Sequence, residues 1–553
     1  MKKMCSLVLA FGMLFGMLCS MPAVAGSDDV YDITWMPAGG SGSYVQLDSV
    51  TERWLEEKYN VNLTIYQVQA NNAEQANLML ASNDMPDVAF LYKSASAMYE
   101  TGLIRSIPES MIREFMPDYT AFLDEHPYGW TINRYPDGNG GFVEGEYAAI
   151  TGYNGTNTGY HWSPMFRYDW LEALGIEAPG EVQEITDGIF WCKEGYTLDQ
   201  FTEIVKAFRD NDPDGNGQRD TFGLSGTTDS SIQYTFYIFG GAMGLRNLNN
   251  FKENGQILPY YVTEGYKNVL SYLSEMYNGD YLDPEFVTQD YAAYWEKFTA
   301  GQVGIMLLNR TYLETRFSDR PPYSVLSRNP DAKLLVTGPT VDENGRGGAV
   351  AYNDIPFSYT TYISNRVEDD KLERVMTMLN DITSDAETFV TVTYGFEGET
   401  FSWEGEPWES AVLTYSSMST ETKGEYAIEA YSVFFRRPEF AKFLNNAQST
   451  VLWNYANSEE GLSKTYVISE YIDYGDKFKN ERADWNDFYN AEMTAVRNEY
   501  LANALTGADV ESTWESYISD LKDRAALDTL LDIMSKYDPA VEVYGLKGLN
   551  VGE

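Results

Sequence analysis

The chain of 553 residues is almost without histidine and cysteine. It has two histidines, His126 and His161, and three cysteines. Mechanisms that need a histidine triad therefore have little material, and zinc sites made of histidine and cysteine clusters are excluded. Cys5 and Cys19 precede an expected cleavage site, which leaves Cys192 alone and rules out a disulfide within the mature chain. We expect stability to come from the hydrophobic core.

Positive charge is scarce as well. The sequence has 39 Lys and Arg against 83 Asp and Glu, which gives a formal net charge of −44. A field of this sign repels phosphate backbones and anionic lipid, so nucleic acid and membrane surfaces are not expected partners. The acids are spread along the chain rather than gathered in one tail. Such a charge favours solubility and the binding of cations.

Long apolar runs are missing beyond the N-terminus. Two lysines precede an apolar run at 7–18, and an Ala-Val-Ala motif ends at residue 25. These features predict a signal peptide at 1–25, with a run too short for a permanent membrane anchor. Cys19 follows Leu18, whereas a lipidation site needs a small residue before the cysteine. We therefore expect a protein exported to the periplasm or the extracellular space, without a lipid anchor.

Strand and helix patterns alternate in the first part of the mature chain. Strands are expected at 31–36, 61–65 and 87–91, and helices near 49–59 and 76–80. This alternation predicts a parallel sheet with right-handed crossovers. Ligands of such sheets bind beyond the carboxyl ends of the strands. Because the chain is too long for a single core, we expect two or more lobes.

The rest of the chain is less regular. Residues 136–159 are rich in glycine, asparagine and tyrosine and predict a segment between lobes. Helices are expected from Arg167 and over 198–208, a buried strand at 303–308, and a strongly helical end at 485–537. No internal repeat or low-complexity tract is found.

Aromatic residues are plentiful, at 15% of the chain with 42 Tyr and 12 Trp. Flat rings stack on sugar faces, and a planar guanidinium binds hydroxyls or carboxylates. The alternative for each aromatic residue is ordinary packing within a lobe, and for Arg167 it is an ion pair with a neighbouring acid such as Asp169. Asn309 either reaches the ligand or caps the preceding strand. The candidate ligand-binding residues are Tyr44, Tyr92, Tyr160, Trp162, Arg167, Asn309, Tyr359 and Trp403.

An acidic loop at 212–224 is the most informative motif. Oxygen-bearing side chains alternate along it, and Gly215 and Gly217 allow the backbone to turn tightly between them. Loops of this kind wrap oxygen ligands around Ca²⁺. The candidate ligands are Asp212, Asp214, Asn216, Asp220 and the backbone carbonyl of Gln218.

The loop departs from an EF-hand at its end. The twelfth position, where an EF-hand has a bidentate glutamate, is Gly223, and a strand-like Phe-Gly-Leu stands where a second helix would begin. The motif predicts an entering helix, a cation loop and an exit into a sheet. The alternative is a solvated turn, since Asp, Asn and Gly favour turns without any metal.

Several segments, in order along most of the mature chain, resemble the extracellular solute-binding proteins of sugar ABC transporters. Within this family the chain is most similar to the long, calcium-loop branch that includes the alginate-binding proteins. Each segment is weak alone, and the ordered set is specific for the superfamily rather than for a ligand. The segments are 78–87, 167–175, 212–224, 281–285, 298–306 and 394–398.

The resemblance implies an α/β fold of two lobes, like that of periplasmic binding proteins, with a hinge and additional C-terminal helices. The family's calcium ligands carry over to the loop residues named above. Some relatives have an acid where this chain has Thr221, so six-fold coordination here would need water. The expected division is a signal peptide at 1–25, the first lobe at 26–155, the second lobe with the calcium loop at 156–330, a return to the first lobe at 331–400, and the second lobe with the C-terminal helices at 401–553.

The resemblance also implies a function. We expect a monomeric, extracytoplasmic protein that captures an oligosaccharide or modified sugar between its lobes and delivers it to an ABC-transporter permease, with Ca²⁺ as a structural ion and no enzymatic activity. The alternative is a secreted glycoside hydrolase or lyase that uses paired carboxylates, for which no motif marks two of the 83 acids. A scaffold or sensor partner with the same fold is a third possibility.

Overall fold

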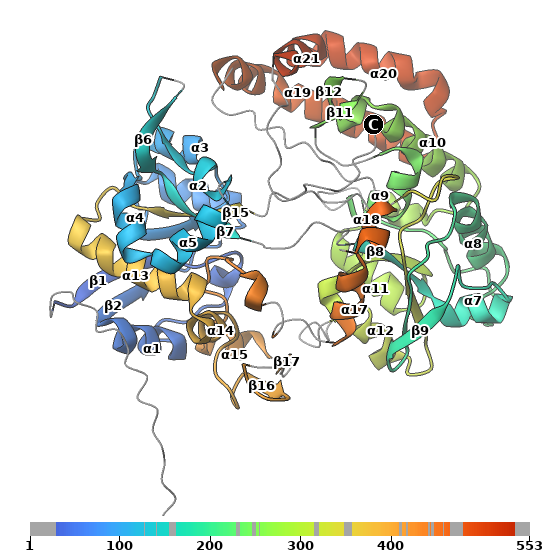
Figure 1. Cartoon of the computed structure of the whole chain (residues 1–553). Coiled ribbons are helices and arrows are strands. Elements are labelled where there is room, and N and C mark those ends of the chain that lie inside the picture. Colours follow the sequence, from blue (N-terminus) through green and yellow to red (C-terminus); the bar gives the residue numbers. More distant parts are fainter. Residues whose placement is uncertain are drawn as a thin grey trace, which may run out of the picture.

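The computed structural model describes residues 29–126, 128–139, 141–153, 162–227, 233–245, 250–253, 255–313, 320–347, 357–408, 412–415, 418–440, 443, 447–456, 458–464 and 479–536. Figure 1 shows these residues in two lobes, each built around its own sheet. The first lobe contains the N-terminal residues, in blue, and the second contains the C-terminal helices, in red. The α/β fold with additional C-terminal helices is therefore confirmed.

The first lobe is built on a five-stranded sheet with the strand order β2-β1-β3-β15-β7. β1 pairs in parallel with β2 and with β3, as the alternation predicts. β15 runs antiparallel to both of its neighbours, β3 and β7. The strands are β1 (Tyr31–Met36), β2 (Val61–Ile65), β3 (Val88–Leu91), β7 (Ala149–Tyr153) and β15 (Phe357–Ile363).

The second lobe has a five-stranded sheet with the order β13-β8-β14-β10-β9. β8 pairs antiparallel with β13 and β14, β10 pairs in parallel with β14, and β9 is antiparallel to β10. The strands are β8 (Trp162–Arg167), β9 (Val182–Thr186), β10 (Ile189–Cys192), β13 (Ile305–Asn309) and β14 (Leu334–Thr337). Smaller sheets comprise β4 (Ile107–Pro108), β5 (Arg134–Pro136), β6 (Phe142–Tyr147), β11 (Asn250–Glu253), β12 (Gln256–Pro259), β16 (Phe401–Glu404) and β17 (Val412–Tyr415).

Helices surround both sheets, and local signals fix many of their ends. The side chain of Ser49 caps α1, and Thr197 and Gln200 form a capping box at the start of α8. The first lobe has α1 (Val50–Tyr59), α2 (Ala73–Ala81), α3 (Ala95–Thr101), α4 (Glu109–Phe115), α5 (Pro117–Glu125), α6 (Tyr128–Thr131), α13 (Asp369–Ser384), α14 (Ala386–Tyr394) and α15 (Thr420–Glu425). The second has α7 (Tyr168–Leu174), α8 (Leu198–Asp210), α9 (Gln233–Phe239), α10 (Glu264–Asn278), α11 (Tyr291–Thr299), α12 (Tyr323–Arg328), α17 (Ala447–Ala456), α18 (Glu459–Ser463), α19 (Lys479–Leu505), α20 (Val510–Ala525) and α21 (Leu527–Ser535).

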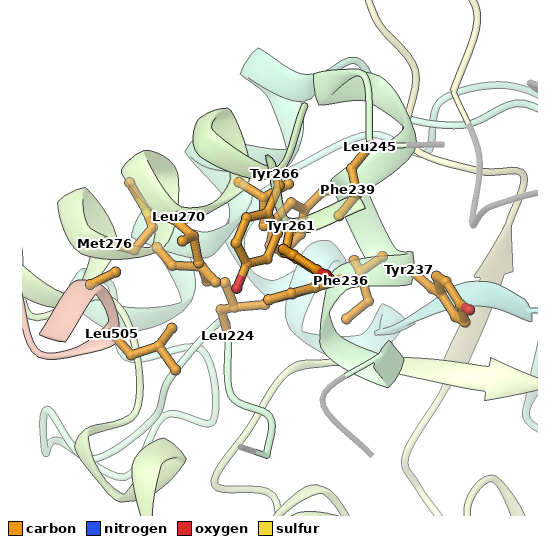
Figure 2. Close-up of a cluster of buried hydrophobic side chains, with 14 of the residues drawn as sticks. Leu224, Phe236, Tyr237, Phe239, Leu245, Tyr261, Tyr266, Leu270, Met276 and Leu505 are labelled. Carbon is orange, nitrogen blue, oxygen red and sulfur yellow. The ribbon is translucent and has the colours of Figure 1, made fainter. Parts of the chain in front are cut away.

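The C-terminal helices are part of the second lobe's core. Figure 2 shows Leu505, from the end of α19, beside Met276 of α10, within one cluster of buried side chains. The Tyr517 hydroxyl donates a hydrogen bond of 3.1 Å to the carbonyl oxygen of Tyr261. This packing buries the apolar face of the predicted helical end. Among the described residues, no helix combines the length and low polarity that a bilayer crossing demands.

The described residues change lobe three times along the chain, and two of these changes come later than the expected division places them. β14 still belongs to the second sheet, so the return to the first lobe comes after residue 337 rather than at 331. Residues 418–440 then stay with the first lobe, where Tyr431 and Phe435 are buried in its core. The chain re-enters the second lobe only before α17, whose Leu452 is buried there. An alternation of elements does not show which sheet a strand will join.

Candidate ligand-binding site and calcium loop

The carboxyl ends of the first lobe's strands form one edge of its sheet. β1, β2 and β3 run in parallel, and β7 runs the same way because both β3 and β7 are antiparallel to β15. Met36, Leu91 and Tyr153 therefore end their strands at the same edge, where β15 begins at Phe357. In open α/β sheets this is the edge beyond which ligands bind.

The second lobe has a matching edge. β10, β13 and β14 run in the same direction, so Cys192, Asn309 and Thr337 end their strands at one side of the sheet. The antiparallel strand β8 begins at this side with Trp162. Each lobe thus has one edge at which several strands end.

The chain runs between these two edges twice. One leaves the first edge after Tyr153 and enters the second at Trp162. The other begins only after Gly347, since Val341 bridges Thr197 and Gly347 N donates a hydrogen bond to the Lys464 carbonyl oxygen, and it enters the first edge at Phe357. An extended chain spans at most about 3.6 Å per residue, so the nine steps from Tyr153 to Trp162 keep these two strand ends within about 32 Å of each other. A ligand between the lobes would meet both edges.

Trp162 and Asn309, which the sequence singled out separately, are neighbours at the second edge. They are direct partners in the pairing of β8 with β13. Trp162 is 8% exposed, and the Asn309 side-chain oxygen accepts hydrogen bonds from Thr311 N (3.0 Å) and Thr311 Oγ1 (2.8 Å). Asn309 thus caps the turn after its strand, and its side chain is fixed in position.

Three candidates lie at the first edge. Tyr92 follows β3 and is 49% exposed. Tyr44 lies beyond the end of β1, where its hydroxyl donates a hydrogen bond of 2.9 Å to the Ile428 carbonyl oxygen. The register of β15 against β7 shifts between Ser358 and Thr360, which makes Tyr359 the extra residue of a β-bulge at the edge. Bulges are frequent next to binding sites.

Arg167 and Trp403 are not brought to these edges. Arg167 ends β8 at the side of the sheet opposite Trp162 and is 5% exposed. Its guanidinium donates hydrogen bonds of 2.9 and 2.5 Å to the carboxylate of Asp169, which is the ion pair named as its alternative. Trp403 lies in the β16–β17 hairpin, where its ring packs against Trp408 with 4.9 Å between ring centroids. Tyr160 lies outside the described residues.

The acidic loop follows α8, as the motif predicts. Asp212, Gly215 and Gly217 have φ values of 47°, 69° and 80°, which turn the backbone tightly. Asp212 accepts hydrogen bonds from Asn216 N (3.1 Å) and Gly217 N (2.9 Å). The Asn216 amide nitrogen lies 2.9 Å from an Asp214 oxygen and 3.2 Å from an Asp220 oxygen. The acidic side chains therefore converge on the middle of the loop.

The electrostatics of the loop suit a cation. Partial burial, a hydrogen bond with Asp212 and the negative charges of Asp220 and Asp212 raise the pKa of Asp214. The donor set is carboxylate and amide oxygen, which hard cations prefer. Within the described ranges, no three His, Cys, Asp or Glu side chains are gathered closely enough to form a finished metal site. The Asn216 amide nitrogen donates hydrogen bonds to the carboxylates of Asp214 and Asp220. A bound cation would attract the same carboxylates.

The loop's exit explains the missing glutamate at its twelfth position. Phe222 and Leu224 form isolated parallel bridges with Val303 and Leu282, so the chain leaves the loop as an extended segment at 222–224, which we call the exit strand. A Cβ atom on Gly223 would lie 2.5 Å from the Cα atom of Val205 in α8. No side chain fits there, because the exit strand lies directly against the backbone of the entering helix. Two isolated parallel bridges therefore lie where the motif predicts an exit into a sheet.

No family model matches the chain, but curated relatives do. The chain is 26% identical over 392 residues to the polygalacturonan/rhamnogalacturonan-binding protein YtcQ of Bacillus subtilis, covering 68% of this chain and 67% of YtcQ. It is 21% identical over 505 residues to the fructooligosaccharide ABC transporter substrate-binding protein FusA of Streptococcus pneumoniae, covering 87% and 85%. The match to lipoprotein LipO of B. subtilis, at 25% identity, spans 42% of this chain and 41% of LipO.

Solved structures share the fold. FusA in complex with kestose superposes with a TM-score of 0.68 at 17% identity, over 92% of this chain and 98% of FusA. An EF-hand mutant of FusA in complex with fructo-nystose superposes with a TM-score of 0.68 at 16% identity, over 91% of this chain and 98% of the FusA mutant. The alginate-binding protein AlgQ2 without calcium ion gives 0.64 at 17%, over 92% and 98%. By name, FusA is a fructooligosaccharide ABC transporter substrate-binding protein, YtcQ binds polygalacturonan and rhamnogalacturonan, and AlgQ2 binds alginate; this chain is similar to all three and shares the fold of FusA and AlgQ2.

Proposed function

We propose that the protein is the extracytoplasmic solute-binding component of an ABC importer and that it captures an oligosaccharide or modified sugar between its lobes. The observation that carries this proposal is the pair of strand-end edges that two crossings join. One edge carries the exposed Tyr92, and the other carries the paired Trp162 and Asn309. Rings that stack on a sugar and polar groups that bind its hydroxyls suit this ligand class.

The proposed mechanism is capture followed by closure. Ligand bound at one edge would contact the other when the lobes close about the crossings. Closure is favoured only by the extra affinity of the ligand for the closed form. The closed form would then be recognised by a permease. Arg167 has no part in ligand contact in this proposal, because it lies at the opposite side of the sheet and is paired with Asp169.

The relatives favour binding over the alternative of a secreted carbohydrate-active enzyme. YtcQ and FusA are binding proteins by name. His126, one of the two histidines in the sequence, packs against the rings of Phe122 and Tyr153, with centroid distances of 4.5 and 5.7 Å. Turnover of chromogenic glycosides that is lost when one carboxylate is replaced would support the enzyme instead.

We further propose Ca²⁺ as a structural ion of the acidic loop. Its ligands would be Asp212, Asp214, Asn216, Asp220 and the carbonyl of Gln218; the hydrogen bonds of Asn216 with the three aspartates support this set. When bound, the ion would neutralise converging carboxylates and hold α8 to the exit strand. The export signal at 1–25, a monomeric state and the absence of a lipid anchor complete the proposal.

Replacing Tyr92 with alanine is expected to weaken oligosaccharide binding by about 10- to 100-fold, because a stacking surface is lost and each factor of ten corresponds to about 1.4 kcal/mol. Tyr489→Ala is the matched control, since Tyr489 is also exposed (37%) but lies on α19 of the second lobe's outer helices. Isothermal titration calorimetry with kestose and with an oligogalacturonide provides the measurement. Equal affinities for both variants would remove Tyr92 from the site.

A further inference from the structure

A segment at 427–436 lies across the ligand-facing edge of the first lobe. Its Ala430 carbonyl oxygen accepts a hydrogen bond of 3.1 Å from Ala38 N, just beyond β1. At its other end, Arg436 N donates a hydrogen bond of 2.6 Å to the Tyr153 carbonyl oxygen at the end of β7. β3 and β15 lie between these two strands in the sheet. We call residues 427–436 the edge segment.

The backbone of the edge segment is strained at three non-glycine residues. Ala427, Glu429 and Phe434 have φ values of 48°, 65° and 48°. This left-handed region is uncommon for any residue with a side chain, and a bulky residue there is a genuine outlier. Such conformations persist only where the surroundings enforce them, and they cluster at binding sites. The edge segment is therefore built to hold a particular shape.

Buried anchors enforce that shape on both sides of Phe434. The Tyr431 hydroxyl donates a hydrogen bond of 3.0 Å to the Glu52 carboxylate, and both groups are buried. Phe435 is 1% exposed and packs against Tyr119 and Phe122, with ring centroids 5.3 and 5.2 Å away. Phe434 itself remains only half-buried. Tyr431 and Phe435 thus anchor the segment in one core cluster, while Phe434 packs, partly buried, against another.

Phe434 lies beside Tyr92. Both rings pack edge to face on Phe90, with centroid distances of 5.2 Å for Phe434 and 5.3 Å for Tyr92. A Cβ atom on Gly39, just after β1, would lie 3.1 Å from Phe434 Cζ and 3.7 Å from Tyr92 Oη. The ends of β1 and β3 and the edge segment therefore bring two partly exposed aromatic rings together around one glycine.

We infer that Phe434 and Tyr92 form a two-ring platform on which one saccharide ring of the ligand stacks through its apolar C–H face. This inference rests on the proposed function and adds a specificity-determining residue to the same site. The strained backbone fixes the orientation of Phe434 before the ligand arrives, and preorganised contacts lose less entropy on binding. The absence of a side chain at Gly39 keeps the two rings in place.

The test replaces Phe434 with glycine, which adopts a φ of 48° without strain. Affinity for the best-bound member of a panel of kestose, cello-oligosaccharide and oligogalacturonide is expected to fall by about tenfold or more, which corresponds to the loss of a stacking contact. The melting temperature is expected to change by only a few degrees, because relief of strain offsets the lost contact with Phe90. Ala427→Gly relieves strain in the same segment without removing a ring, and it should leave affinity unchanged.

Two results would overturn the platform. Unchanged affinity in Phe434→Gly would show that the ring does not contact ligand. A large fall in melting temperature, beyond that of Ala427→Gly, would show that Phe434 is a core residue, whether or not any sugar binds. If the wild-type protein binds no member of the panel, the proposed function fails, and the platform fails with it. Wild-type binding with an unaffected Phe434→Gly variant would refute the platform alone.

Discussion

Replacing Lys297 with methionine is expected to destabilise the folded protein by about 3–5 kcal/mol, the largest single-site effect that we expect. The Lys297 ammonium lies 2.5 Å from an Asp283 oxygen, and the Asp283 side chain is 3% exposed. The same carboxylate accepts hydrogen bonds from Ser225 Oγ (2.7 Å) and Glu285 N (3.0 Å). Methionine would leave a buried carboxylate without its counter-charge. Removing one partner of a buried ion pair costs far more free energy than the intact pair contributes to stability.

The measurement is urea unfolding, monitored with a probe that lies in the second lobe. Lys333→Met is the matched control, because Lys333 lies 2.8 Å from Glu172 while both side chains are nearly half exposed, at 43% and 46%. Such surface pairs contribute about 0–1 kcal/mol. Similar free energies of unfolding for the two variants would show that the Asp283–Lys297 pair is solvated in the native protein, contrary to its burial.

Chelation of calcium is expected to lower the melting temperature of the protein while leaving its affinity for sugar nearly unchanged. An ion that binds only the folded state stabilises it by about 2.7 kcal/mol when its concentration is a hundredfold above Kd. The acidic loop belongs to the second lobe, between α8 and the exit strand that bridges Val303. It does not contribute a strand end to the edge that we propose to face the ligand. Loss of sugar binding in a chelated protein that is still folded would contradict this assignment.

Replacing Asp214 with asparagine is expected to change the melting temperature in opposite directions in the absence and in the presence of calcium. Burial and neighbouring carboxylates raise the pKa of Asp214 in the ion-free protein above its ordinary 3.8. The folded, ion-free state therefore favours the protonated form, and this contribution to stability is lost as the pH rises through the raised pKa. At pH 7 without calcium, asparagine removes repulsion and should raise the melting temperature. With calcium it removes a ligand and should lower it. The same sign in both conditions would exclude the ion from this loop.

The sequence predicted the first lobe's parallel strands well because local patterns determine them. The alternation at 31–36 and 61–65 and the apolar run at 87–91 each specify a strand, and short helices between them force parallel pairing. The loop motif at 212–224 also specified its own geometry, including the exit strand. In both cases the residues that carry the signal are close together in the chain.

The site was predicted only in part, because it is assembled by long-range pairing. Trp162 and Asn309 are 147 positions apart and become neighbours only when β8 pairs with β13. Arg167 was a candidate from sequence together with Trp162, but the two residues are the last and the first of the six-residue strand β8 and therefore lie at opposite edges. Phe434 had no periodic pattern or motif to mark it, and its position depends on the anchors Tyr431 and Phe435. A non-glycine residue with positive φ has no signature in sequence.

The central claim is that the facing edges of the two lobes capture a sugar, and calorimetric titration of the calcium-loaded protein with an oligosaccharide panel tests it most directly. The panel should include kestose, cello-oligosaccharides and oligogalacturonides, with hydrolysis followed in the same samples. We predict saturable binding of one ligand per protein by at least one member, with the ligand recovered intact. Absence of binding throughout the panel, or conversion of any sugar to shorter products, would contradict the account.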